Sequence, residues 1–241
     1  MGVPGNPPLV LLHALGESGG DWAPVDAKLA AYFRVHAPDL RGHGDSDWPG
    51  NYSLGLMARD VTSWLDRLGL DKVVLVGHSM GAGVAYLIAM DEPGRVGQLV
   101  IEDAAPLYRR DRQVPERPEG FAGGFDWAVV PAIVNQVNAG DPAMWEGLAA
   151  ITAPTLIIGG ARSYISQARL AEAAALIPRC DLVTIDAGHN VHREQPAEFA
   201  RTVLGWLGAA RPVAARPEPD GLPIRTMTDR TSLHANVAHD R

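Results

Sequence analysis

The amino-acid sequence predicts an α/β fold in which helices cover both faces of a doubly wound, mostly parallel sheet. Two observations support this fold class. Short runs rich in Val, Ile and Leu alternate with longer segments of helical periodicity, and this alternation is typical of α/β domains. Several runs lack a polar residue at every second position, so they fit strands that are buried on both faces. A chain of 241 residues is long enough to form one sizeable core.

The predicted strands and helices follow one another in a regular order. The strands are expected at residues 9–13, 34–37, 72–77, 98–102, 155–159 and 182–185. Ser53 can cap a helix with one apolar face, and Gly69 ends it. A second helix is expected at residues 166–177, before Pro178. A third is expected at residues 196–207, because the first turn of a helix tolerates proline.

Two regions interrupt this alternation. Residues 104–150 form a long insertion that holds two of the four Phe and two of the six Trp residues of the chain. Insertions of this length are commonly functional, and the aromatic content favours a small helical lid over a core of residues 1–103 and 151–208. The tail, residues 209–241, is rich in proline and mixed charge. We expect it to be poorly structured or docked on the core.

The composition argues against several classes of protein. The net charge is -7, and no cluster of Lys or Arg offers a surface for nucleic acid. No apolar run approaches the ~18 residues of a membrane span, and the N-terminus lacks the basic segment of a signal peptide. The single cysteine, Cys180, fits a reducing compartment. We therefore expect a cytoplasmic protein that associates neither with nucleic acid nor with a membrane.

Cofactor motifs are also missing from the sequence. It has neither a phosphate-binding P-loop nor a dinucleotide-binding glycine motif. The pair His189 and His192 lacks both the spacing and the glutamate of a zinc helix. We therefore expect neither a cofactor nor a metal.

The segment Gly77-His78-Ser79-Met80-Gly81 provides a candidate nucleophile. It follows a buried strand and precedes a helix of small and apolar residues, which is the strand–turn–helix context of a G-x-S-x-G nucleophile elbow. On so tight a turn the hydroxyl of Ser79 stands clear of the sheet. The N–H of Met80 starts the following helix, where it can bind a developing oxyanion.

Three further motifs occur in the order found in the α/β-hydrolase superfamily, which the chain resembles from residue 13 to about residue 207. They are His13-Ala14-Leu15-Gly16, Asp39-Leu40-Arg41-Gly42-His43-Gly44-Asp45-Ser46 and Gly188-His189. The resemblance implies an α/β-hydrolase fold with the N–H of Leu15 as a second oxyanion donor. The chain departs from the family at Ala14, where glycine is more usual. It begins near the family's third strand, so we expect the N-terminal hairpin to be missing.

His189 is the candidate general base. It follows the last predicted strand and precedes the final helix, which places it at the edge of the sheet where Ser79 emerges. It also comes last in the chain order serine, acid, histidine of this fold. His192 is its nearest rival, whereas His13 and His43 are expected to anchor loops.

The candidate acid is assigned by resemblance to a smaller group. Residues 160–167 cover the commonest position of the acid in the superfamily, and they contain no carboxylate. The stretch LVIEDAAP and the later GGARSYI resemble the YbfF/ABHD11-like esterases, in which a serine replaces the later aspartate and an earlier aspartate acts instead. This resemblance implies Asp103 as the acid. Glu102 stays the alternative, although its side chain points the opposite way if the strand continues.

Together these residues predict a serine hydrolase that acts on small carboxylic esters or lactones. Ser79 would attack, His189 would transfer the proton and Asp103 would orient His189. Three alternatives stay open: a hydrolase-fold protein that binds a small molecule without turnover, a C–C bond hydrolase, and a cofactor-free haloperoxidase. The protein is expected to be a monomer or a homodimer.

An apolar substrate pocket is expected above the strand ends. Its candidate residues are His13, after the first strand, and four side chains of the insertion: Phe125, Trp127, Met144 and Trp145. The competing interpretation of the aromatic rings is that they pack the insertion against the core.

Overall fold

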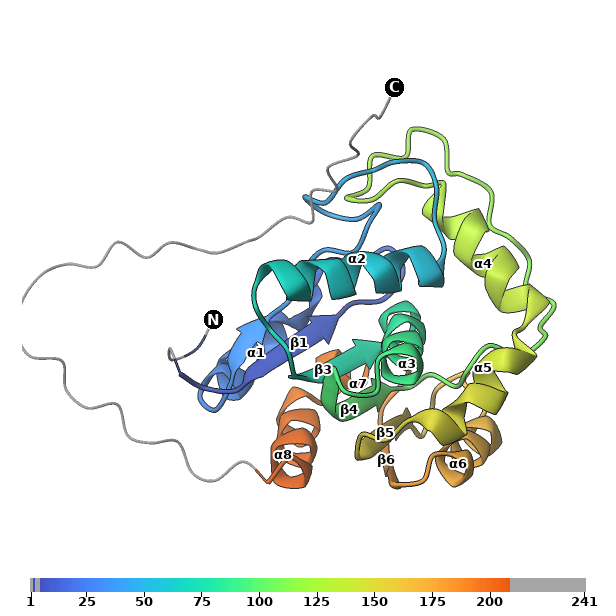
Figure 1. Cartoon of the computed structure of the whole chain (residues 1–241). Coiled ribbons are helices and arrows are strands. Elements are labelled where there is room, and N and C mark those ends of the chain that lie inside the picture. The colour runs from blue at the N-terminus through green and yellow to red at the C-terminus, as the bar shows by residue number, and fades with distance from the viewer. Residues whose placement is uncertain (1, 3–4, 209–241) are drawn as a thin grey trace, which may run out of the picture.

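The computed structural model describes residue 2 and residues 5–208, and it contains one parallel sheet of six strands in the order β2-β1-β3-β4-β5-β6 (Figure 1). The strands are β1 Pro8–Leu12, β2 Arg34–His36, β3 Val73–His78, β4 Val96–Glu102, β5 Thr155–Gly160 and β6 Cys180–Ile185. The bounds of each strand lie close to those expected from the apolar runs. The predicted fold class is confirmed.

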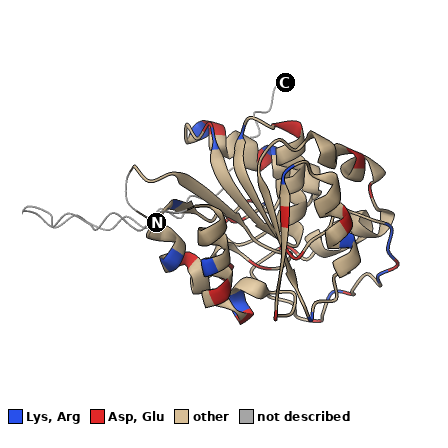
Figure 2. Cartoon of the chain, turned by 90° about the horizontal axis from the view of Figure 1, so that it is seen from below, with Lys and Arg blue, Asp and Glu red and all other residues tan. Residues whose placement is uncertain are grey.

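Helices cover both faces of this sheet. One face carries α2 (Leu54–Arg67), α3 (Met80–Asp91) and α6 (Gln167–Leu176). The other carries η1 (Gly19–Trp22), α1 (Ala23–Ala30), α7 (Val191–Glu194) and α8 (Pro196–Trp206). Figure 2 shows acidic and basic residues interspersed along the helices. None of the helices in the described part of the chain is long and apolar enough to cross a membrane.

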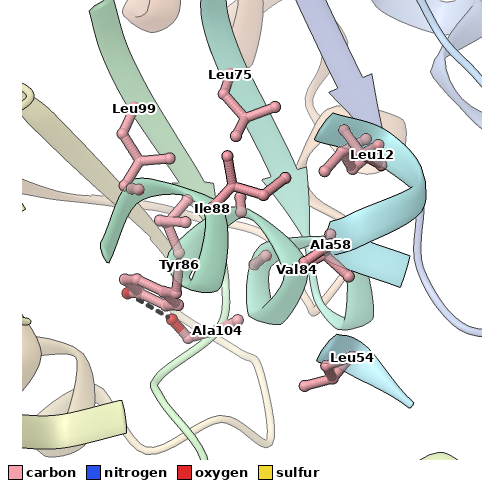
Figure 3. Close-up of a cluster of buried hydrophobic side chains, with 14 of the residues drawn as sticks. Leu12, Leu54, Ala58, Leu75, Val84, Tyr86, Ile88, Leu99 and Ala104 are labelled. Carbon is pink, nitrogen blue, oxygen red and sulfur yellow. Dashed lines mark hydrogen bonds between the residues drawn. The ribbon is translucent and has the colours of Figure 1, made fainter. Parts of the chain in front are cut away.

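The alternation of side chains along the strands divides the core into two hydrophobic clusters. In β1, Val10 and Leu12 face the cluster shared with α2 and α3, whereas Leu9 and Leu11 face the cluster shared with α1 and α8. Figure 3 shows part of the first cluster, in which α3 packs against β3 and α2. Because both faces are covered, the strands need the continuous apolar runs seen in the sequence.

Local signals explain where several helices begin and end. The hydroxyl of Ser53 accepts the N–H of Leu56 at 3.1 Å, which caps α2 as predicted. Gly69, with a φ of 64°, follows the C-terminus of α2. The short helix α1 was not predicted, because only Val25 and Leu29 are buried in it and its apolar periodicity is weak.

The insertion begins directly after Asp103 and returns to the sheet at β5. A long irregular stretch comes first, and it is followed by α4 (Val129–Ala139), α5 (Pro142–Glu146) and η2 (Gly147–Ala150). Val129 and Ile133 of α4 join the cluster shared by α2 and α3, so the insertion packs on that face of the core. The tail at residues 209–241, for which the sequence left two interpretations, lies outside the described residues.

Candidate active site

The candidate residues gather at the carboxyl ends of the strands, where the strand order reverses. β1 lies between β2 and β3, so the chain moves one way from β1 to β2 and crosses back to reach β3. The crevice between the loops that follow β1 and β3 is the topological switch point, at which open α/β sheets bind ligands. Ser79 directly follows β3, and Leu15 lies in the loop after β1.

Ser79 sits on a strained turn between β3 and α3. Its backbone has φ 52° and ψ -110°, a region that residues with a side chain rarely adopt. Glycine is needed on both sides of this turn. A Cβ on Gly77 would lie 2.5 Å from the carbonyl oxygen of Gly81, and one on Gly81 would lie 2.2 Å from that of Leu12. The small residues therefore allow α3 to approach β1 and β3 closely.

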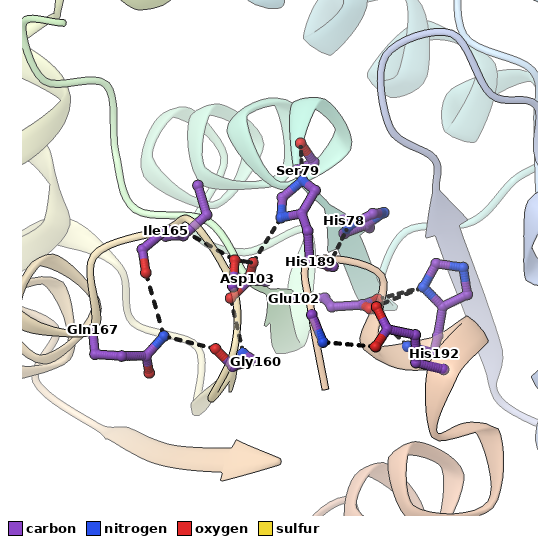
Figure 4. Close-up of polar contacts among 12 residues, drawn as sticks. His78, Ser79, Glu102, Asp103, Gly160, Ile165, Gln167, His189 and His192 are labelled. Carbon is purple, nitrogen blue, oxygen red and sulfur yellow. Dashed lines mark hydrogen bonds and ion pairs between the residues drawn. The ribbon is translucent and has the colours of Figure 1, made fainter. Parts of the chain in front are cut away.

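Ser79, His189 and Asp103 form a continuous hydrogen-bonded chain (Figure 4). The Nε2 atom of His189 lies 2.9 Å from Oγ of Ser79, and its Nδ1 atom lies 2.6 Å from Oδ2 of Asp103. Asp103 is fully buried, so water does not compete for its carboxylate. The geometry has the three parts of a nucleophilic triad, namely a hydroxyl, an imidazole within reach of it and a carboxylate that orients the imidazole.

The carboxylate of Asp103 is held by more than His189. Its Oδ1 atom accepts the backbone N–H of Gly160 at 2.9 Å, and its Oδ2 atom accepts the hydroxyl of Ser163. Both donors come from the end of β5 and the loop after it, where the superfamily more often carries the acid. The hydroxyl of Tyr86 binds the next residue, donating to the carbonyl of Ala104 at 3.2 Å. The sequence indicated a serine at 163 but not its contact with Asp103.

Asp103 also has a positive φ, 49°, directly after the last residue of β4. Ser79 and Asp103 are the two non-glycine residues with positive φ among those the structure describes. Strained backbone of this kind persists where surrounding contacts hold it, and it is concentrated at functional sites. No feature of the sequence predicted this conformation at Asp103.

Two buried histidines fix the loop that contains Leu15. The Nε2 atom of His43 accepts the backbone N–H of Gly16 at 3.1 Å. The Nε2 atom of His13 accepts the backbone N–H of Leu40 at 2.9 Å. The Nδ1 atom of each ring faces a backbone carbonyl, that of Ala14 for His13 and that of Arg41 for His43. Each ring therefore uses one nitrogen as acceptor and the other as donor, which only a neutral imidazole can do.

The electrostatics agree with neutral rings at both positions. Burial and the neighbouring His43 lower the pKa of His13 to about 4, and burial also lowers the pKa of His43. The backbone N–H groups of Leu15 and Met80 donate to no other group in the described part of the chain. Both residues line the space next to Ser79, so these donors are free for a ligand oxygen.

A cavity of about 90 Å³ lies over Ser79, between the core and the insertion. Most of its lining is apolar and comes from α3, from the start of the insertion and from α4: Met80, Gly83, Ala104, Ala105, Pro106, Leu107, Ile133, Val134 and Val137. Arg110, Arg112 and Tyr164 add polar groups. The ring of Tyr164 lies 4.7 Å from that of His189, a contact that the sequence did not reveal.

Comparison with known proteins identifies the family of this chain. A model of the alpha/beta hydrolase family matches residues 9–202. The chain belongs to the α/β-hydrolase family. An uncharacterized protein of Mycobacterium tuberculosis is 41% identical over 104 residues, and this match spans 43% of the present chain but only 30% of that protein.

Two further relatives span most of the chain. The mouse sn-1-specific diacylglycerol lipase ABHD11 is 27% identical, and the match covers 83% of this chain and 81% of that protein. The crystal structure of the enol-lactonase from Burkholderia xenovorans LB400 is 25% identical, with a TM-score of 0.78 over 86% of this chain and 94% of its own. The ABHD11-like relationship inferred from the sequence is confirmed.

Glu102, the alternative acid, has a different partner in this hydrolase fold. Its carboxylate lies 2.9 Å from Nδ1 of His192 and accepts the N–H of His192 at 2.8 Å (Figure 4). Nε2 of His192 lies 3.2 Å from Oδ2 of Asp21, an ion pair without hydrogen-bond geometry. Burial opposes a charge on His192, but the carboxylates of Glu102 and Asp21 outweigh it and raise the pKa of His192 to about 9. His192 is thus a buried imidazolium between two carboxylates.

The same region contains the one group of described residues that could hold a metal ion. Ligand atoms of Asp21, His78 and His192 lie within 4.8 Å of one another. The proton on His192 already supplies positive charge there, and burial lowers the pKa of His78 to about 4, which keeps that ring neutral. The expectation that the protein holds no metal stays a prediction.

The five residues expected to line the substrate pocket do not line the cavity over Ser79. This part of the prediction was wrong. His13 lies beneath the loop it holds. Phe125 stacks on His43, with ring centroids 5.7 Å apart, and Trp127 stacks on Phe125. Their rings therefore brace the insertion against the core, as the competing interpretation stated.

Met144 and Trp145 support the cavity from behind. The sulfur of Met144 accepts the N–H of Leu107 at 3.5 Å, and Nε1–H of Trp145 donates to the carbonyl of Leu107 at 3.0 Å. Leu107 itself faces the cavity. Met144 and Trp145 thus hold Leu107, which lines the cavity, and do not line the cavity themselves.

Proposed function

We propose that this protein is a serine hydrolase that cleaves carboxylic esters or lactones through an acyl-enzyme intermediate. The observation that carries the proposal is the hydrogen-bonded chain from Ser79 through His189 to Asp103. It opens into a cavity at the switch point of the sheet, beside the free N–H groups of Leu15 and Met80.

Acylation follows from this geometry. Oγ of Ser79 attacks the carbonyl carbon while Nε2 of His189 takes the hydroxyl proton. Asp103 accepts the Nδ1–H of His189 and stabilises the imidazolium. The N–H groups of Leu15 and Met80 bind the oxyanion of the tetrahedral intermediate. His189 then gives the proton to the leaving alkoxide, and the acyl group stays on Ser79.

Deacylation repeats these steps with water as the nucleophile. His189 takes a proton from water, which attacks the acyl carbon, and the same proton returns to Oγ of Ser79 as the acid leaves. For a lactone, the alcohol and the acid are parts of one molecule, so the product is a hydroxy acid. No step needs a group beyond those that the site provides.

The size of the cavity favours small acyl groups. A cavity of about 90 Å³ holds only a handful of water-sized groups, since one such group needs roughly 10–15 Å³. A short acyl chain or a small lactone ring fits this space. We propose that the insertion acts as a lid over it. The similarity to an enol-lactonase and to a diacylglycerol lipase agrees with acyl-oxygen cleavage.

The deciding experiment compares the hydrolysis of p-nitrophenyl butyrate by the wild type and by Ser79→Ala. Turnover by the wild type that disappears in the folded variant is the expected result. A fluorophosphonate, which phosphonylates activated serines with loss of fluoride irrespective of substrate preference, provides a second readout at Ser79. Wild-type protein that neither turns over a panel of esters and lactones nor reacts with the fluorophosphonate would contradict the proposal and favour a binding protein.

A further inference from the structure

The cavity over Ser79 contains an unpaired positive charge. Arg110 lines this cavity from the first stretch of the insertion, and Arg112 lies beside it. The Nε atom of Arg110 is buried and has no hydrogen-bond partner among the described residues. A buried donor without a partner is uncommon in folded proteins, and it needs an explanation.

The surroundings of Arg110 do not neutralise it. Its guanidinium lies over the ring of Tyr108, 4.1 Å from the ring centroid. Neither Arg110 nor Arg112 forms an ion pair with a carboxylate in the described part of the chain. The acid in the cavity lining is Asp103, and its oxygens already bind other groups. Burial and the like charge of Arg112 hold the pKa of Arg110 below its ordinary range.

We infer that the substrate carries a carboxylate, which Arg110 binds while the ester or lactone carbonyl lies at Ser79. This inference rests on the proposed function, because it names the substrate class of the same site. A guanidinium presents neighbouring N–H groups that match the two oxygens of a carboxylate. The remaining walls are apolar, so they fit the short carbon chain between the carboxylate and the scissile carbonyl.

The small cavity favours a carboxylate over a bulkier anion. Guanidinium groups bind phosphates as well as carboxylates. The cavity has room for only a handful of water-sized groups, so the half ester of a short dicarboxylic acid fits it better than a substrate with a phosphate group. Surface arginines commonly face only solvent, and Arg109 is such a residue, because it is exposed and does not line the cavity. It therefore provides a matched control next to Arg110 in the chain.

The test uses two ethyl esters of the same acyl length, because an alkoxide is too poor a leaving group for the free carboxylate to expel by itself. Monoethyl succinate and ethyl butyrate differ in a terminal carboxylate against a methyl group. We expect the wild type to prefer the succinate in kcat/KM. Arg110→Gln should lower the succinate-to-butyrate ratio about 10- to 100-fold, the scale of one charged hydrogen-bonded contact. Arg110→Lys should retain part of the preference, whereas Arg109→Gln should leave the ratio unchanged.

Other outcomes overturn the inference in distinguishable ways. Arg110 does not bind a substrate carboxylate if the wild type hydrolyses both esters equally well. The same follows if Arg110→Gln leaves the succinate-to-butyrate ratio of kcat/KM unchanged. If neither ester is turned over, calorimetric titration of succinate into the wild type and Arg110→Gln still decides the matter. Binding that depends on Arg110 keeps the carboxylate site, and no binding removes it. The reaction of Ser79 with the fluorophosphonate decides the hydrolase proposal separately. A preference for a phosphorylated acyl ester would assign the site to phosphate instead.

Discussion

Ser79, Asp103 and His189 each have a close neighbour in the chain whose side chain does not line the cavity. The neighbours are His78, Glu102 and His192, and all three are fully buried. Nε2 of His78 lies 3.0 Å from the carbonyl oxygen of His189, which it can bind as a donor, and Glu102 binds the ring and the N–H of His192. The same short segments therefore carry the proposed reacting groups on one side and the contacts that hold these segments together on the other.

The adjacent carboxylates of Glu102 and Asp103 should respond differently to the loss of their charge. Asp103→Asn removes the negative charge that stabilises the imidazolium and should lower kcat by about 10⁴-fold with little loss of stability. Glu102→Gln should act mainly on the fold, because it leaves the buried His192 short of counter-charge, and it should lower the free energy of unfolding by about 3–5 kcal/mol. Measuring kcat and thermal unfolding for both variants separates these roles. Near-normal turnover by Asp103→Asn would refute the assignment of the acid.

The choice between these two residues shows how far sequence reasoning reaches. Side chains alternate along β4, so the two carboxylates were expected on opposite sides, but a shift of one residue would exchange them. Their partners come from loops about 60 to 90 residues away in the chain: Ser163 and His189 for Asp103, and His192 for Glu102. Residue types and spacing named the candidates, whereas only the packed loops show which carboxylate meets which partner.

The start of α3 depends on its close approach to β1. A Cβ on Gly81 would lie 2.2 Å from the carbonyl oxygen of Leu12, and neither backbone segment can move without shifting the elbow. Gly81→Ala should therefore destabilise the protein by on the order of 2–4 kcal/mol and lower its activity.

Gly55 in α2 is the matched control for Gly81, because nothing lies within 4 Å of the position its Cβ would take. Gly55→Ala should stabilise the protein by about 0.5–1 kcal/mol through higher helix propensity. Denaturant unfolding of both variants measures the contrast. Equal effects of the two substitutions would contradict the role given to the close contact.

The elements differ in how well the sequence predicts them. The strands were found within a few residues, because strands buried on both faces need continuous apolar runs whatever surrounds them. The insertion was recognised by its composition, but the direction of its side chains was not. Phe125 and Trp127 brace loops, and the wall over Ser79 comes from Leu107 and α4 instead. Tertiary packing decides which side chains of such a segment face the core, and the periodicity of the sequence does not predict them.

The buried histidines of this protein differ in charge, because the fold lowers the pKa of two of them and raises the pKa of a third. Burial keeps His13 and His78 neutral, with pKa values of about 4, against about 6.5 in an unfolded chain. The unfolded chain therefore binds more protons between pH 6.5 and 4, and stability falls as the pH is lowered through this range. His192 has a pKa raised to about 9, so its contribution is complete below pH 6.5 and is lost as the pH rises toward 9.

The free energy of unfolding should therefore be greatest near pH 6.5 and decline on both sides. Each of these histidines should contribute on the order of a few kcal/mol at its end of the pH range. Thermal unfolding between pH 4 and 9.5 measures the curve. His13→Gln should flatten the acid side, since it removes one group that must stay neutral, and His192→Gln should flatten the alkaline side while lowering the maximum. A wild-type stability that keeps rising from pH 6.5 to 9 would show that His192 is not a buried imidazolium.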